Sequence, residues 1–358
     1  MRVLFKTDYN QDIKFAKHGG YVFWYALLLV AVFLAPVALD TYWVNELTRV
    51  LIYALAGLGL MVVTGFTGQV SLGHAAFMAI GAYTHAFLLT QGVPFVFSLP
   101  IAALTSGIVG LMIAIPASRM TGLYLTIASL AFAIVVEDLI IHWESVTGGN
   151  RGMAVDPPAL FGYEIYAAWE YYYIVLVLLI ISIALVLNIL RSPLGRAMLA
   201  IRDSEISAQS LGIRLARTKV LALFLSAIIT GLAGGLFAHF IQFLSPETFG
   251  ILLSIQLLLM IVVGGLGTVH GAIFGAFLIG LLEASISILK DWLPPAIGTQ
   301  PGLEPGLFGL ILVLFIIFEP EGVYGRWVKL RTFLESFPFY RRNTFKRQRS
   351  YLKTERMR

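Results

Sequence analysis

The chain has 358 residues, of which 58% are hydrophobic and only 13% are charged, and its mean hydropathy is +0.85. Soluble domains carry about 25% charged residues, so this deficit excludes a cytosolic enzyme, a disordered protein and a coiled coil. The chain contains no cysteine, so neither a disulfide nor a thiolate metal site can form. The composition predicts an all-α polytopic membrane protein.

The first long uncharged run covers Gly19–Leu39 and follows a segment that contains four basic residues. A signal peptide and a retained transmembrane helix can both begin in this way. The run has 21 residues, which is longer than a typical apolar signal region, and Leu34–Ala38 is a poor cleavage site. We therefore expect a retained first helix at about 20–39.

The second run, Val50–Ser118, has no charged residue over 69 positions. At about 1.5 Å per residue it would extend roughly 100 Å as a helix, which is enough for three crossings of a hydrocarbon core about 30 Å thick. Asp40–Arg49, which precedes the run, is expected to be an external loop. The three crossings are expected at about 50–66, 71–90 and 96–116.

The remaining apolar runs predict further helices at about 120–138, 171–190, 220–243 and 305–320. Before the last of these, the uncharged run 248–282 would span only about 52 Å as a helix, short of two full crossings. Either the second crossing continues past Glu283, or the pair is a re-entrant loop that turns at Gly264–Gly267. The expected total is about ten transmembrane or re-entrant helices.

The distribution of basic residues predicts the orientation, because cytoplasmic loops of membrane proteins are enriched in lysine and arginine. Residues 1–18 hold four basic and two acidic groups, 191–219 hold six and two, and 326–358 hold eleven and two. Residues 137–170 hold six acidic groups and one arginine. We therefore place both termini and 191–219 in the cytoplasm, and 137–170 outside.

These charges divide the chain into three parts. They are a cytoplasmic N-terminal segment at 1–18, a transmembrane domain at 19–322 and a basic cytoplasmic tail at 323–358. The external loop 137–170 is rich in turn residues, which is typical of an ordered lid, of a docking surface or simply of a long connection.

The sequence offers no residues arranged for catalysis. It has no Gly-x-x-x-x-Gly-Lys-[Ser/Thr] motif that would cradle a phosphate. His74 and His85 would lie about 16 Å apart on one helix, too far to share a metal. Glu283 is the one isolated acid in an apolar stretch and is expected near an external helix end, so no ion-coupling carboxylates are evident. We expect no catalytic residue, metal or bound cofactor, and uphill transport would need an external energy source.

Two glycine-rich segments interrupt apolar regions with polar groups. We call Gly65–His74 the first glycine patch and Gly264–Gly271 the second glycine patch. Glycines at 267, 271 and 275 share one helix face, which favours close helix packing. The alternative is a pair of broken helices that face the substrate in a duplicated core. The candidate residues of the translocation pathway are then Gln69, Ser71, His74 and Thr268.

The cytoplasmic loop 191–219 carries signals for two short helices. Ser192 before a proline is typical of a helix start. Asp203 can cap a second helix, with Glu205 in its first turn and Gly212 stopping it. Such a capped helix suits insertion into the groove of a partner, and the alternative is an ordinary surface helix.

Four stretches of the sequence occur in a characteristic order. They read GFTGQVSLGHAAFMAIGAY at 65–83, AIRDSEISAQSLGI at 200–213, VVGGLGT at 262–268 and FEPEG at 318–322. Together they resemble the permeases of the high-affinity branched-chain amino acid ABC importer, LivM type. The resemblance covers roughly residues 45–328 and gives the basic tail no role.

The resemblance implies an ABC importer permease fold embedded in the lipid of a bacterial or archaeal cytoplasmic (inner) membrane. It implies a second permease of LivH type, two cytoplasmic ATPases that bind ATP and Mg²⁺, and an extracytoplasmic substrate-binding protein, with no nucleic acid. It also implies that loop 191–219 is a coupling loop whose second helix docks into an ATPase. The residues of this coupling helix are Asp203, Ser204, Glu205, Ala208 and Gly212.

The function expected from this resemblance is that of the transmembrane permease subunit of an ATP-driven importer for leucine, isoleucine and valine, not that of an enzyme. Two alternatives remain open. Urea and short-chain amide ABC permeases resemble the same family, and the motifs above do not separate them. A stand-alone facilitator or channel would need neither a coupling helix nor ATPases.

Overall fold

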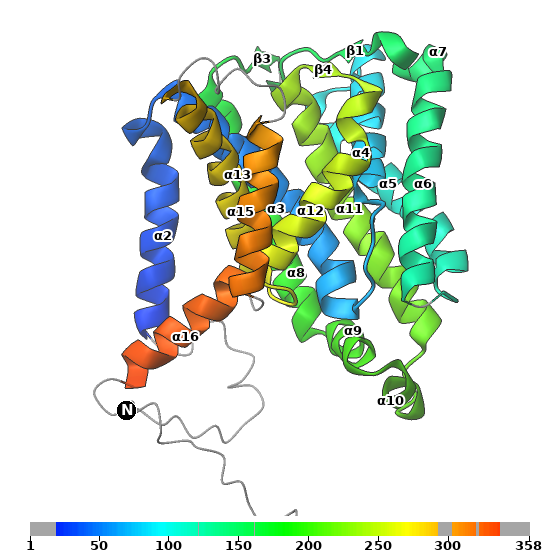
Figure 1. Cartoon of the computed structure of the whole chain (residues 1–358). Coiled ribbons are helices and arrows are strands. Elements are labelled where there is room, and N and C mark those ends of the chain that lie inside the picture. The colour runs from blue at the N-terminus through cyan, green and yellow to red at the C-terminus, as the bar shows by residue number, and fades with distance from the viewer. Residues whose placement is uncertain (1–18, 121, 161, 293–302, 320–321, 337–358) are drawn as a thin grey trace, which may run out of the picture.

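The structure, a computed structural model, describes residues 19–120, 122–160, 162–292, 303–319 and 322–336. Within these residues the chain is almost entirely helical (Figure 1). Each predicted segment corresponds to one helix. These helices are α2 (Gly19–Ala38), α3 (Thr41–Thr67), α4 (His74–Thr90), α5 (Phe95–Ala117), α6 (Leu123–His142), α8 (Ala168–Arg191), α11 (Leu215–Ile241), α12 (Ile251–Gly264), α13 (Val269–Trp292) and α15 (Leu303–Phe318). The predictions for 1–18 and for the tail beyond residue 336 lie outside the described residues.

In the described part of the chain, seven helices are long and apolar enough to cross a membrane by length and composition. They are α3, α5, α6, α8, α11, α13, and α12 together with the short turn η2 (Pro246–Phe249) that precedes it. Helices α2 and α15 contain shorter apolar stretches, and α4 has 17 residues. The fold is therefore all-helical with seven candidate spans, and the total of ten stays a prediction.

The connections between the helices gather at two opposite ends of the bundle (Figure 1). At one end lie α7, β1, β3 and β4, and at the other lie α9, α10 and α16. The short elements of the structure are α7 (Glu144–Thr147), η1 (Gly149–Arg151), β1 (Met153–Ala154), β2 (Ala159–Leu160), β3 (Tyr163–Glu164), α9 (Pro193–Asp203), α10 (Glu205–Ser210), β4 (Phe243–Leu244) and α16 (Gly322–Ser336). Strand β1 pairs antiparallel with β4, and β2 with β3. The acidic loop and the basic loop thus lie at opposite ends, as the charge-based orientation requires.

The prediction of an external loop at Asp40–Arg49 is wrong, because α3 already begins at Thr41. The charges that indicated a loop are paired on the helix. Arg49 Nη2 lies 2.6 Å from Glu46 Oε2, and Arg49 Nη1 lies 3.0 Å from Glu283 Oε2. Since pairing lowers the cost of placing charges in a membrane protein, the helix continues through them.

Helices α12 and α13 show features of both alternatives that the sequence left for 248–290. Helix α13 continues past Glu283 to Trp292, and the chain turns between α12 and α13 within the second glycine patch. Glu283 is not isolated, since its carboxylate accepts a hydrogen bond from Gln256 of α12 as well as pairing with Arg49. These contacts tie α3, α12 and α13 together.

Small residues let the central helices approach closely. Helix α11 packs along α5, α3 and α4. A Cβ atom added at Gly81 would lie 2.1 Å from the carbonyl oxygen of Gly231, and one added at Gly234 would lie 1.9 Å from that of Met78. Such backbone contact is the usual basis of helix association in membranes, where lipid competes for apolar side chains.

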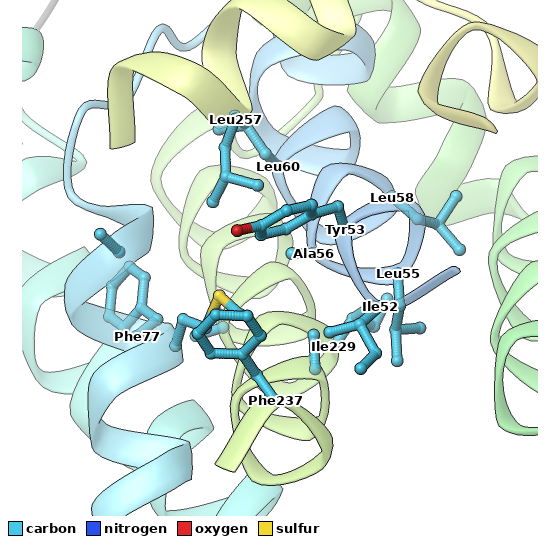
Figure 2. Packing of buried hydrophobic residues seen from close by; sticks show 14 of the residues in the cluster. Ile52, Tyr53, Leu55, Ala56, Leu58, Leu60, Phe77, Ile229, Phe237 and Leu257 are labelled. Atoms are coloured by element: carbon cyan, nitrogen blue, oxygen red, sulfur yellow. The ribbon is translucent and has the colours of Figure 1, made fainter. Parts of the chain in front are cut away.

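Aliphatic and aromatic side chains fill the space between the central helices (Figure 2). Tyr53 of α3 and Phe237 of α11 are buried, and their ring centroids lie 5.8 Å apart. Leu257 of α12 and Phe77 of α4 belong to the same cluster. The cluster places α3 at the centre of the bundle, and both glycine patches lie beside its C-terminal end.

Candidate functional site

Helix α9 anchors the cytoplasmic loop to the bundle. As predicted, it begins after Ser192, whose Oγ accepts a hydrogen bond from the Gly195 N–H at 3.4 Å, with Pro193 in the first turn. Met198 and Ile201 are fully or almost fully buried. The helix therefore has one face fixed in the core, and it presents its last turn to the residues that follow.

The predicted cap of the second helix is displaced by one residue. Asp203 belongs to the end of α9, and Ser204 caps α10 by accepting a hydrogen bond from the Ser207 N–H at 3.2 Å. Ser204 has the extended backbone that an N-cap needs, whereas the Asp203 carboxylate accepts hydrogen bonds from Arg202. Aspartate and serine are both good caps, so the sequence could not separate the two positions.

The other end of α10 confirms the predicted stop. Gly212 has φ of 83° and donates its N–H to Gln209, while Ile213 donates its N–H to Ala208 at 3.1 Å. This pair of bonds is a Schellman motif, in which glycine closes a helix by adopting a left-handed conformation. Ala208, within α10, is buried. Helix α10 is thus a short unit that is closed at both ends.

An ion pair that the sequence analysis missed attaches α10 to the bundle. Glu205 Oε1 lies 2.7 Å from Nζ of Lys219 in the first turns of α11, and Lys219 is only 3% exposed. A lysine at the start of an apolar helix looks like an ordinary interfacial charge, so the sequence carried no signal for this pairing. In contrast, Ile206 and Leu211 are 83% and 79% exposed. The segment therefore presents two large apolar side chains to its surroundings.

The first glycine patch is an unwound segment between α3 and α4. Gly68 closes α3 with φ of 72°, and the chain leaves the helix until His74. Two backbone groups of the segment are satisfied by α6: the Leu72 N–H donates to Ser129 Oγ, and the Val70 carbonyl accepts from Thr126. The segment is held in place although it has no helical hydrogen bonds.

His74 is completely buried and hydrogen-bonded at both ring nitrogens. Ser226 donates its proton to the Gly59 carbonyl, so it accepts one from His74 Nε2 at 2.7 Å. Nδ1 then accepts from Ser71 Oγ at 3.0 Å. The histidine joins α3, α4 and α11, and it does not line the cavity formed by its neighbours Gln69 and Ser71.

Gln69 and Ser71 line a small cavity at the end of the bundle that carries α9 and α10. Apolar side chains such as Val63 and Phe77 form most of its wall, and Lys219 is its one charged group. The cavity has a volume of about 30 Å³, which holds one or two water molecules and no amino acid. The structure therefore brings two of the four pathway candidates together at one small cavity.

The second glycine patch is a tight turn. Thr268, the fourth pathway candidate, caps α13 by accepting the Gly271 N–H at 3.0 Å. A Cβ atom added at Gly264 would lie 1.8 Å from the Gly271 carbonyl oxygen, and one added at Gly275 would lie 1.8 Å from that of Met260. Gly271 and Gly275 thus lie in backbone contact between α12 and α13, as the packing interpretation predicted. Gly267 does not share their helix face, because it precedes α13 and contacts Arg202.

The described residues contain no group of three or more His, Asp or Glu side chains that could hold a metal. His74 and His85 do not meet. His85 of α4 instead contacts His239 of α11, with 2.8 Å between their Nε2 atoms, and His239 is bonded through Nδ1 to the Asp156 carbonyl. This buried pair joins two helices to the loop at the opposite end of the bundle.

The seven apolar spans among the described residues define a multi-pass membrane protein. The profile of the family described as "Branched-chain amino acid transport system / permease component" matches residues 42–318. The chain belongs to this family. It is therefore a permease component of a branched-chain amino acid ABC transport system, a transport subunit and not an enzyme.

Individual relatives agree with this assignment. The chain is 34% identical to the high-affinity branched-chain amino acid transport system permease protein LivM of Salmonella typhimurium strain LT2 over 84% of this chain and 74% of the relative. It has the same identity and coverage with LivM of Escherichia coli K12. It is 26% identical to the probable permease LivH of Methanocaldococcus jannaschii over 79% of this chain and 91% of the relative. No solved structure matches the chain significantly.

Proposed function

We propose that the chain is the LivM-type subunit of an ATP-driven importer for leucine, isoleucine and valine. It pairs with a second permease of LivH type, and it works with two cytoplasmic ATPases that bind ATP and Mg²⁺ and with an extracytoplasmic binding protein. Similarity to both LivM and LivH proteins supports an assembly of two related permeases. The energy for uphill transport then comes from the ATPases.

In this proposal α10 is the coupling helix. The observation that carries it is the exposure of Ile206 and Leu211 on a short segment closed by caps at both ends. Large apolar side chains that are exposed beside a rigid support mark a protein interaction site. The proposed contact residues are those of the short segment itself, namely Asp203, Ser204, Glu205, Ala208 and Gly212 with the two apolar side chains.

The proposed orientation places both termini and α10 in the cytoplasm and the loop 137–170 outside, where the binding protein docks. The opposite positions of the acidic and basic loops support it. A reporter active only in the cytoplasm should function when inserted within 214–219 and fail when inserted within 148–156. Activity at 148–156 would reverse the orientation.

The coupling role is best tested through Ile206 and Leu211. Reversing Glu205 would place two cations together at the buried Lys219 and would perturb folding. We expect Ile206→Asp and Leu211→Asp to leave permease abundance unchanged, because both side chains are exposed, and to release the ATPases on purification. Ile206→Leu, which keeps an apolar contact, is the matched control. Retention of active ATPases by both aspartate variants would refute the coupling assignment.

The substrate and the facilitator alternative are tested in vesicles that contain the whole transporter. Leucine uptake should require ATP and the binding protein, and urea and acetamide should not compete. Uptake of urea or acetamide instead would indicate the amide permeases. Uptake that is independent of ATP and unaffected by Ile206→Asp would indicate a facilitator.

A further inference from the structure

The last turn of α9 lies where the two glycine patches meet. A Cβ atom added at Gly65 would lie 2.9 Å from the backbone nitrogen of Gly267, so the two patches touch through backbone atoms. A Cβ atom added at Gly68 would lie 3.3 Å from Arg202 Cγ, and one added at Gly267 would lie 2.8 Å from Arg202 Nη1. The side chain of Arg202 therefore packs against both patches at once.

The guanidinium of Arg202 also connects this junction to α10. Nη1 donates to the Gly65 carbonyl oxygen at 3.4 Å. Nε and Nη2 donate to Asp203 Oδ1 at 3.2 Å and 3.1 Å, and Asp203 directly precedes the cap of α10. Gly65 lies in the last turn of α3, where carbonyl groups lack helical partners and where a cation is favoured by the helix dipole.

The second glycine patch contacts α16 through Gly265 and His270 and contacts α2 through His270. At Gly267 itself the turn is held more weakly. Gly267 has φ of 81° and no side chain, and its N–H donates to the sulfur of Met61, a weak acceptor, at 3.3 Å.

Helix α10 is joined to α9 through the single non-helical residue Ser204. A displacement of α10 would therefore act on two contacts. One is the Glu205–Lys219 ion pair with α11. The other, joined to α10 through Ser204, is the Asp203–Arg202 pair, which reaches the glycine junction.

We propose that Arg202 is a positioning residue that links the coupling segment to the junction of the two glycine patches, so that movement of α10 displaces the turn between α12 and α13. This inference rests on the proposed function and adds to it the route by which the movement enters the bundle. Lysine cannot replace the arginine fully, because a point charge does not provide the planar fork that contacts Gly65 and Asp203 together.

The test uses the complete importer in vesicles and measures radiolabelled leucine uptake and ATP hydrolysis in the same preparation. We expect Arg202→Ala to keep its ATPases and hydrolyse ATP, while the leucine imported per ATP falls by about tenfold, within the usual range for coupling between sites. Arg202→Lys should recover part of this ratio. Arg119→Ala, which removes an exposed arginine between α5 and α6 at the same end of the bundle, should match the wild type.

An unchanged ratio of leucine to ATP in Arg202→Ala would overturn the inference, even if both rates fell together, because that result indicates a structural role only. If Arg202→Ala does not accumulate, Asp203→Asn and Arg202→Lys decide the matter, since both keep the packing on the glycines. An unchanged ratio in both would equally overturn the link. Absence of ATP-dependent uptake by the wild type would refute the proposed function, and this inference with it.

Discussion

In the first glycine patch the backbone leaves the helix from Gly68 to Gly73. Serine side chains of α6, α11 and α12 accept hydrogen bonds from the Leu72 N–H, the His74 ring and the Ala75 N–H. In the second patch the chain turns within a few residues, and the glycines of α12 and α13 lie in backbone contact. Both segments mix glycine with threonine and histidine. Glycine permits an unwound segment in the first patch and leaves room for a neighbouring helix in the second. Composition alone therefore does not define the role of a glycine-rich segment.

The largest effect is expected in α13, next to the second patch. Gly275→Ala would place a Cβ atom 1.8 Å from the Met260 carbonyl oxygen, and a backbone atom cannot move aside as a side chain can. We expect destabilisation of about 3 kcal/mol, near the upper end for overpacking, measured as lower thermal stability of the purified permease. Gly57→Ala is the control, because its Cβ would lie 3.6 Å from Ile261 Cγ2 in ordinary contact. Equal stability of the two variants would show that α12 and α13 are not closely packed.

A smaller effect is expected from the buried histidine of the first patch. His74→Ala removes the hydrogen bonds to Ser71 and Ser226 and leaves a void among fully buried groups. The loss should be about 2 kcal/mol, as for two hydrogen bonds and a small cavity. His142→Ala is the control, since its side chain is 74% exposed, and it should change stability by less than about 0.5 kcal/mol. If His74→Ala were as stable as the control, the polar network would not hold the unwound segment.

Loss of the helix cap that Thr268 forms in the second patch should lower stability by a still smaller amount. Thr268→Ala removes the hydroxyl that accepts the Gly271 N–H and donates to the Gly265 carbonyl. Loss of such a cap costs about 1 kcal/mol. Thr268→Ser keeps the hydroxyl and should restore the stability. A serine variant as unstable as the alanine variant would assign the loss to the methyl group and not to the cap.

The sequence predicted most of the fold because apolar runs and charge gaps report directly on membrane spans. It failed at the start of α3, where Arg49 pairs with Glu283 from a distant part of the chain. In a sequence, a charged residue indicates a loop unless the residue that pairs with it is known. A turn at Gly264–Gly267 was one of the two alternatives from the sequence, because consecutive glycines favour a break between helices, and the structure has this turn.

For the candidate site, signals that lie within one helix were predictable, and contacts between helices were not. Ser192 and Gly212 act as the start and stop that their neighbours indicate. The shift of the cap from Asp203 to Ser204 is local, since Asp203 bonds to the adjacent Arg202 within α9 and both residue types are good caps. The buried Lys219 instead pairs with Glu205 of another helix. Such pairings are set by tertiary packing, which periodicity and propensity do not describe.

The last prediction concerns substitutions that should change stability least. It compares the accessibility of the two glycine patches to thiol reagents during transport. Ser71 lines the closed cavity and is 4% exposed, whereas its neighbour Val70 is 41% exposed. In a chain without native cysteine, Ser71→Cys should be protected from small aqueous thiol reagents at rest, because the cavity holds no more than one or two waters. If the unwound segment borders the translocation pathway, its labelling should rise about tenfold during ATP turnover of the complete importer.

Val70→Cys is the control for reagent access and should be labelled in every state. Thr268→Cys should be labelled to the same extent with and without turnover, because a turn that moves as one unit with its helices keeps its exposure. Protection of Ser71→Cys in all states, with Val70→Cys labelled, would assign the first glycine patch to packing as well. The contrast between the patches would then be one of geometry and not of function, since neither would meet the substrate.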